Sequence, residues 1–206
     1  LAKKNKIYLY KKNLPKNISF KEFNCIKGNL LNSADLKKIP KKIDIVFFLL
    51  GLTGGPQSMD INNLRKFLDY NCETLLLFLK TIKKIKLKKI VFTSTEQVYG
   101  DANKGLLKDN RFEPKPINYY GASKLIAEKI LYNFYEKSKI NIDILRIPRV
   151  IGVRNDDIIS KIIISAKKKN KIYLSKTNAK FNFIHINDLL DAFNLCLSKT
   201  KTGFRI

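Results

Sequence analysis

Short apolar runs alternate with long helical patterns along this chain of 206 residues. The run Ile43–Leu50 is apolar at nearly every position, which is typical of a parallel strand buried on both faces. Met59–Lys84 and Tyr119–Lys137 instead place apolar residues three and four apart, which predicts long amphipathic helices. Because strands joined by such helices form right-handed crossovers, the pattern predicts an α/β fold with a doubly wound parallel sheet.

The other expected elements continue this alternation. Further strands are predicted at Lys6–Tyr10, Phe23–Lys27, Lys89–Ser94, Ile142–Ile147 and Lys171–Leu174. A polar loop is predicted at Gly100–Pro116, and further helices are predicted at Asp156–Lys168 and Asn187–Leu197. Asn187 is the expected N-cap of the last helix, because its side chain can accept a hydrogen bond from the first turn.

Lysine dominates the charge of the chain, whose formal net charge is +24. Such a balance first suggests a nucleic-acid partner. However, only six of the 41 cationic residues are arginines, the side chains that bind phosphates and bases in bidentate fashion. The lysines also occur throughout the polar segments rather than in one stripe, so we interpret them as solvated surface charge and expect no nucleic-acid partner. Their field should still attract anionic substrates.

Membrane association, disulfides and metal sites are not indicated. No apolar run reaches the length of a membrane span, and Leu1–Lys6 has no apolar stretch typical of a secretory signal. Three cysteines without a C-x-x-C pair and a lone histidine provide neither a disulfide framework nor a metal cluster. We therefore expect a cytoplasmic protein that binds no metal.

The candidate chemistry follows three predicted strands. Ligands of parallel sheets bind beyond the carboxyl ends of the strands, here Leu49–Gly55, Thr93–Gly100 and Arg146–Arg154. Tyr120 and Lys124 are four apart in a predicted helix and share one face. An ammonium group beside a phenol lowers the phenol pKa and creates an acid/base near neutral pH, while Thr95 is placed to hydrogen-bond a substrate oxygen. By itself, a Tyr-x-x-x-Lys spacing in such a lysine-rich chain is also typical of a plain helix surface.

Several motifs together resemble one enzyme family. The segment at 91–100, VFTSTEQVYG, is similar to the strand end SS-x-x-VYG of the extended short-chain dehydrogenase/reductases, the NAD-dependent epimerase/dehydratase group that acts on nucleotide sugars. The segment at 116–124, PINYYGASK, followed by Glu128, resembles the catalytic helix of that family. Weaker likenesses at 46–52, 70–71, 145–152 and 183–188 occur in the family's order, so the resemblance spans nearly the whole chain.

The resemblance implies a Rossmann-like sheet and a catalytic site. Residues 1–150 would form a NAD(P)-binding domain, and residues 151–206 would form part of a small substrate lobe with interleaved segments. Tyr120 would be the catalytic acid/base, Lys124 would hold the nicotinamide ribose and lower the tyrosine pKa, and Thr95 would polarise the sugar carbonyl or hydroxyl.

The resemblance also implies contacts with NAD or NADP. The family usually has an acidic residue where Lys11 stands, followed here by Lys12, and a 2′-phosphate would suit these cations; NADP is therefore favoured over NAD. Asn29 replaces an aspartate that reads the adenine, which alters that contact. Asn71 would support the cofactor site, although it could also cap or kink its helix. The other implied contacts are Leu30, Leu49, Leu50, Gly51, Leu52, Thr53 and Pro148.

The expected substrate contacts bear on the reaction. Gln97 occupies the position of a dehydratase acid two residues after Thr95, and an amide cannot take a proton from the sugar. Glu96, one place earlier, should point elsewhere. Arg149 replaces a family asparagine, and Arg154 is a further candidate for the diphosphate. We therefore favour a nucleotide-sugar epimerase or reductase; a dehydratase or decarboxylase, or a non-catalytic cofactor-binding member, remains the alternative.

No glycine-rich G-x-G-x-x-G loop occurs, although the resemblance places one after the first strand. We interpret the chain as an inactive fragment that lacks this strand and part of the substrate lobe; a natural short form is the alternative. The missing strand would lie between the strands Lys6–Tyr10 and Ile43–Leu50, so a gap is expected there.

The remaining residues have structural interpretations. Glu128 is expected to form a salt bridge, Arg146 to pair at its strand end, and His185 to be structural. Cys72 and Cys25 are expected in the core. A homodimer through the two long predicted helices is the expected assembly.

Overall fold

A four-stranded parallel sheet is the centre of the computed structural model, which describes residues 5–13, 23–83, 85–100, 113–152, 158–169, 181–197 and 202–206. The strands follow the order β3-β4-β5-β8, and every neighbouring pair is parallel. Their bounds are Ile45–Phe48 for β3, Lys89–Thr95 for β4, Asn141–Ile147 for β5 and Phe204–Arg205 for β8. The predicted α/β class with parallel strands is confirmed.

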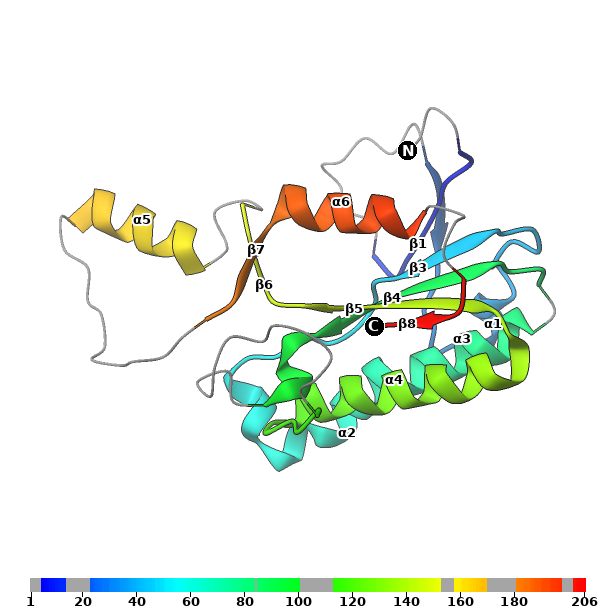
Figure 1. The fold of residues 1–206 in the computed structure, drawn as a ribbon, viewed down its shortest axis with the longest axis horizontal. Helices are drawn as coiled ribbons and strands as arrows, with labels where there is room; N and C mark the ends of the chain where they lie inside the picture. The colour runs from blue at the N-terminus through cyan, green and yellow to red at the C-terminus, as the bar shows by residue number, and fades with distance from the viewer. Residues whose placement is uncertain are drawn as a thin grey trace.

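Helices cover both faces of this sheet (Figure 1). One face carries α2 (Leu64–Leu68), α3 (Thr74–Ile82) and α4 (Tyr119–Ser138), and the other carries α6 (Ile186–Cys196). The ring of Phe193 in α6 meets Phe47 of β3 edge to face, with ring centroids 5.7 Å apart. The arrangement is therefore doubly wound, as predicted.

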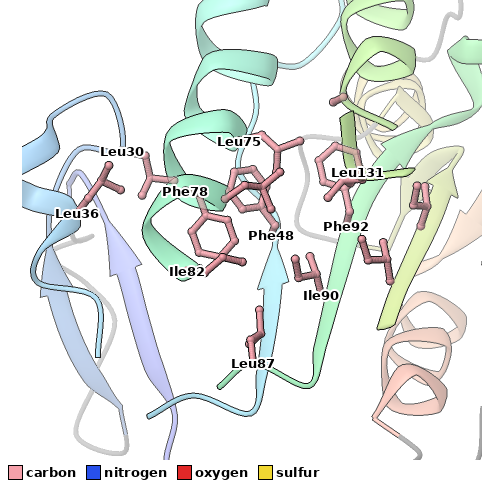
Figure 2. Close-up of a cluster of buried hydrophobic side chains, with 14 residues drawn as sticks. Leu30, Leu36, Phe48, Leu75, Phe78, Ile82, Leu87, Ile90, Phe92 and Leu131 are labelled. Carbon is pink, nitrogen blue, oxygen red and sulfur yellow. The ribbon is translucent and has the colours of Figure 1, made fainter. Parts of the chain in front are cut away.

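The main core lies between the sheet and the pair α3 and α4 (Figure 2). Phe48 of β3 stacks beside Phe92 of β4, with ring centroids 6.1 Å apart, and Phe78 of α3 packs on Phe48 at 5.3 Å. Fully burying a side chain of this kind contributes about 1.5–3 kcal/mol. Such contacts fix α3 and α4 against the strands whose carboxyl ends form the site.

The sheet is interrupted on one side of β3. Within the described residues, strand β1 (Tyr8–Lys11) pairs in parallel with β2 (Asn24–Lys27) and with no other strand, in a separate two-stranded sheet. Leu30 and Leu36, which follow β2, still join the core near Phe78 (Figure 2). Among the described residues no strand lies between β1 and β3, which is where the sequence analysis expected a gap.

The segment predicted as a single helix over Met59–Lys84 is not one regular helix, so that prediction is wrong in detail. It begins with 3₁₀ turns, η2 and η3, continues as α2, passes through a π-helical turn η4, and ends as α3. The π turn η4 follows α2 and precedes α3 without a break in the chain of helical residues, so the apolar pattern could not reveal it. The bounds are Pro56–Met59 for η2, Ile61–Asn63 for η3 and Asp69–Glu73 for η4.

The last helix begins one residue before its predicted start. His185, not Asn187, is the N-cap of α6: its Nδ1 accepts a hydrogen bond from the backbone N–H of Asn187 at 3.3 Å. The prediction of an Asn187 cap was therefore wrong. His185 ends β7 (Phe183–His185), which pairs with β6 (Arg149–Ile151) in a third sheet.

Several short elements could not be predicted because tertiary contacts stabilise them. They are α1 (Ser33–Leu36), η5 (Glu96–Tyr99), β6 and β8. Helix α5 spans Ile158–Lys169, close to its prediction. The predicted strand Lys171–Leu174 and Arg154 lie outside the described residues. None of the described helices is long and apolar enough to cross a membrane.

Candidate active site

The N-terminus of α4 docks on the end of β4. Asn118 caps α4, accepting a hydrogen bond from the backbone N–H of Gly121 at 2.8 Å, and donates one to Oε1 of Gln97 in η5 at 2.9 Å. Gly121 itself touches η5, since a Cβ at this position would lie 2.5 Å from the carbonyl oxygen of Gln97. This close contact brings Tyr120 beside Thr95.

The Thr95 hydroxyl, which accepts a hydrogen bond from the backbone N–H of Gln97 at 3.3 Å, lies close enough to the Tyr120 phenol to affect its pKa. Burial raises the pKa of Tyr120, and the Thr95 hydroxyl only partly opposes this shift. Tyr120 is therefore a protonated donor at neutral pH. The expected lowering of the tyrosine pKa by Lys124 is absent here, because the lysine binds elsewhere.

Lys124 is 4% exposed and lies under the loop that follows β3. Its Nζ donates to the carbonyl oxygen of Thr93 at 3.0 Å and sits 4.8 Å from the ring centroid of Phe92. Burial lowers the pKa of Lys124 to about 8, although Cys72 and Glu128 act to raise it. The side chain is thus charged at neutral pH and titrates only slightly above it.

Asn71 joins three parts of the site from the π turn η4. Its Oδ1 accepts from the backbone N–H of Leu52 at 2.7 Å, and its Nδ2 donates to the Leu52 carbonyl at 3.2 Å and to Oγ of Ser123 at 2.8 Å. The Ser123 hydroxyl donates in turn to the carbonyl of Tyr120 at 2.8 Å. Asn71 therefore fixes the β3 loop to α4. A π turn at this place is typical of functional sites.

The loop after β3 passes directly over Lys124. A Cβ on Gly51 would lie 2.8 Å from Nζ of Lys124 and 2.9 Å from Oδ1 of Asn71, so only glycine lets the backbone come this close. Leu49, before the glycine, is 58% exposed, and Thr53, after it, is also exposed. Leu50 packs against the core instead.

Glu96 and Gln97 point to different partners, as expected. Oε2 of Glu96 accepts from Nδ2 of Asn182 at 3.0 Å. Burial raises the pKa of Glu96, while Asn182 and the charge of Arg149 oppose that shift. The Arg149 guanidinium lies 4.8 Å from the ring centroid of Phe181. Gln97 instead faces the cap of α4.

The predicted adenine-side residues lie at the ends of β1 and β2. Lys11 and Lys12 are exposed, and the carbonyl of Lys11 accepts from Gly28 at 3.1 Å. Asn29 uses its side-chain oxygen to accept from Leu31 at 3.1 Å. Leu30 is buried in the core, and Pro148 is half-buried between β5 and β6.

Sequence reasoning missed two residues of the site. Asn118, an asparagine just before an apolar helix, carries an N-cap signal that could have been found. Asn182 could not, because it meets Glu96 across 86 positions of sequence. The expected structural roles hold elsewhere: Glu128 and Arg146 pair with each other, and Cys72 is buried, whereas Cys25 is only half-buried.

A parallel sheet with tyrosine, lysine and threonine side chains gathered at its carboxyl edge is the arrangement that the sequence resemblance implied. The sequence model of one protein family, described as "NAD dependent epimerase/dehydratase family", matches residues 2–205 of this chain. The chain therefore belongs to that family.

Two curated relatives illustrate this membership. A dTDP-D-glucose 4,6-dehydratase of Dictyostelium discoideum is 32% identical over 200 residues, covering 88% of this chain and 45% of the relative. A Bacillus subtilis (strain 168) protein named as an uncharacterized UDP-glucose epimerase is 32% identical over 143 residues, covering 69% of this chain and 44% of the relative. The chain spans about half the length of the curated relatives it matches.

Solved structures agree on the fold. A UDP-glucuronic acid 4-epimerase from Bacillus cereus, in complex with UDP-glucuronic acid and NAD, is 25% identical with a TM-score of 0.76, covering 90% of this chain and 59% of that one. A UDP-glucose 4-epimerase from Thermotoga maritima, in complex with UDP-glucose, is 17% identical with a TM-score of 0.84, covering 98% and 68%. The Rossmann-like fold is thus confirmed.

The described residues fit the nicotinamide-ribose end of an NAD-type cofactor. Lys124 offers an ammonium donor and Tyr120 a hydroxyl, and Gly51 keeps the neighbouring backbone free of a side chain that would crowd the lysine. Leu49 adds an exposed apolar surface beside this backbone. A planar ring and a ribose with two hydroxyls require this combination of apolar and hydrogen-bonding groups.

Proposed function

We propose that the protein is an NAD(P)-dependent epimerase or reductase that acts on a nucleotide sugar. The observation that carries this proposal is the neighbouring pair Tyr120 and Thr95, with Lys124 one helical turn away, at the carboxyl edge of the sheet. The bound cofactor would supply the hydride acceptor or donor. The chain's own residues would bind the sugar and move its proton.

Tyr120 would hold the proton that a reduced sugar oxygen needs. Its raised pKa keeps the hydroxyl protonated at neutral pH, so it is a ready proton donor to a sugar carbonyl. Thr95 would donate its hydroxyl hydrogen to the same oxygen. For the reverse step Tyr120 must accept a proton, and movement of the Lys124 ammonium toward it would favour the phenolate.

The proposal is tested with full-length protein, a panel of UDP- and dTDP-sugars, and NAD or NADP. We expect at least one sugar to be converted to its epimer or reduced, as followed by product NMR and cofactor absorbance. Cofactor binding without conversion of any sugar would instead favour a non-catalytic cofactor-binding protein.

Dehydration is the second candidate, because Glu96 is a half-buried acid with a raised pKa and one curated relative is named as a dehydratase. We expect no 4-keto-6-deoxy sugar from any nucleotide hexose, since the amide of Gln97 cannot act as the base and already accepts from Asn118. Mass spectrometry for loss of water checks this. Accumulation of that product in the wild type, abolished in Glu96→Gln, would make the protein a dehydratase.

For the cofactor we propose NADP over NAD. Exposed Lys11 and Lys12 stand at the end of β1, which would face the adenosine ribose, and Lys11 occupies the position where a carboxylate would bind that ribose. Lys11→Asp should therefore shift the ratio of kcat/KM toward NAD by removing a cation and adding a ribose acceptor. Lys42→Asp, an exposed lysine before β3, is the control. An unchanged ratio in Lys11→Asp would contradict NADP recognition by this residue.

We also propose a homodimer through the helices α2 to α4. Exposed apolar side chains of α4 (Ile126 and Tyr132) and of η3, which leads into α2 (Ile61), support it. Sedimentation velocity of the full-length protein is the measurement.

A further inference from the structure

A buried carboxylate lies directly behind the candidate catalytic residues. Glu128 follows Lys124 by one turn of α4 and is 3% exposed. Its Oε1 accepts from Oγ of Ser94 at 2.5 Å and from Nε of Arg146 at 3.1 Å, and its Oε2 accepts from Nη2 of Arg146 at 2.7 Å. Arg146 thus binds the carboxylate through two nitrogens, the strongest geometry for such a pair.

The same network extends to the turn after β4. The free arm of Arg146 donates from Nη1 to the hydroxyl of Tyr99 at 2.8 Å, and its guanidinium lies 4.7 Å from the centroid of the Tyr99 ring. Tyr99 ends η5, the turn that begins directly after Thr95. Ser94 precedes Thr95 in β4. One carboxylate on α4 is therefore connected to both segments that flank Thr95.

Stability alone does not account for this arrangement. Removing two charges from water is costly, and well-packed apolar residues of similar volume often stabilise a protein as well as or better than a buried ion pair. What the network does provide is geometry, because every hydrogen bond fixes one segment of the site relative to another. Ser94, Tyr99 and Arg146 belong to different elements; Glu128 binds Ser94 and Arg146 directly, and Arg146 connects it to Tyr99.

We propose that Glu128 is a positioning residue of the active site. Through its contacts with Ser94 and Arg146, it fixes the positions of the Lys124 side chain and of η5, the turn after Thr95. This inference rests on the proposed function only where it predicts an effect on catalysis. The placement of the lysine can be measured without any substrate.

The groups around Lys124 predict the direction in which its pKa should shift when Glu128 is replaced. Glu128, on the same helix, and Cys72, on η4, both act to raise the pKa of Lys124, while burial lowers it to about 8. Thr93 of β4 contributes its carbonyl, and Arg146 of β5 faces Glu128 rather than the lysine. Glu128→Gln removes the nearby negative charge and leaves Arg146 unneutralised. Both changes disfavour an ammonium group, so the pKa of Lys124 should fall.

The experiment measures this pKa in full-length protein labelled with ¹³C-lysine, by NMR titration of the Cε resonance that Lys124→Met removes. In Glu128→Gln we expect the pKa of Lys124 to fall by at least about 0.5 unit. The alkaline limb of the kcat/KM profile should move to lower pH by the same amount. Glu136→Gln is the matched control, because Glu136 forms an exposed ion pair with Lys139 at 3.1 Å on the same helix; it should change neither quantity.

A second variant keeps the proposal testable if Glu128→Gln fails to fold. Glu128→Gln combined with Arg146→Met replaces both buried charges with neutral side chains of similar size, a change that proteins often tolerate. It should still lower the pKa of Lys124, since Arg146 is the more distant charge. A wild-type pKa in every folded variant would overturn the proposal. A shifted pKa in a protein that converts no sugar would leave the positioning role intact and refute only the proposed function.

Discussion

Tyr120→Phe is expected to lower kcat by about 10²–10⁴-fold, the usual contribution of a positioned general acid or base. The substitution removes only the phenolic hydroxyl, which lies beside Thr95. The ring should keep its place against Phe67, with ring centroids 6.1 Å apart, so cofactor affinity should change little. Steady-state kinetics and calorimetric titration of the cofactor give the two quantities in the full-length protein.

Two variants on the same helix complete this test. Lys124→Met should lower both kcat and cofactor affinity, because the lysine is the proposed ribose donor and lies one helical turn from Tyr120. Tyr132→Phe removes a hydroxyl from an exposed tyrosine of α4 and should leave both unchanged. Wild-type turnover in Tyr120→Phe would refute the acid/base assignment.

Asp143→Asn is expected to reduce the free energy of unfolding by about 3–5 kcal/mol, the usual cost of removing one partner from a buried charge cluster. Asp143 lies near the start of β5 and is almost fully buried. Its carboxylate pairs with buried Lys89 at 3.3 Å and accepts from Nε of Arg205 at 2.6 Å. The cluster joins β4, β5 and β8 at the end of the sheet opposite the site. Urea denaturation measures the loss.

Asp44→Asn is the matched control, because Asp44 pairs with Lys88 at 2.5 Å while both side chains are largely exposed. An exposed pair of this kind contributes about 0–1 kcal/mol, so this variant should unfold close to the wild-type midpoint. Equal effects of the two substitutions would show that burial of the Asp143 cluster contributes nothing to stability.

Much of the fold could be predicted from the order of apolar segments. The strands β4 and β5 were predicted within one residue of their bounds, and α4 within one residue of its end. A strand at the centre of a parallel sheet must be apolar on both faces, and a long helix must carry one apolar stripe. The residue pattern within each element is therefore enough to predict it. Element β8 has only two residues and carries no such local signal.

The main residues of the candidate site could also be predicted from the sequence. Tyr120, Lys124 and Thr95 occur at spacings that a helix and a strand end convert into proximity. Their residue types already define which groups can donate a proton. The order and types of the residues were thus enough to predict the family, the parallel sheet and the identity of the candidate catalytic groups.

How those groups are paired and how they titrate could not be predicted, because both depend on packing between distant segments. Lys124 faces the Thr93 carbonyl rather than Tyr120, and burial, which no local pattern encodes, raises the pKa of the tyrosine. Asn71 reaches Ser123 across 52 positions of sequence because a π turn presents it to α4. Such contacts depend on how separate crossovers pack on one sheet, and the desolvation of a side chain depends on what then covers it. Neither the contacts nor the desolvation therefore follows from the order of residues within any one element.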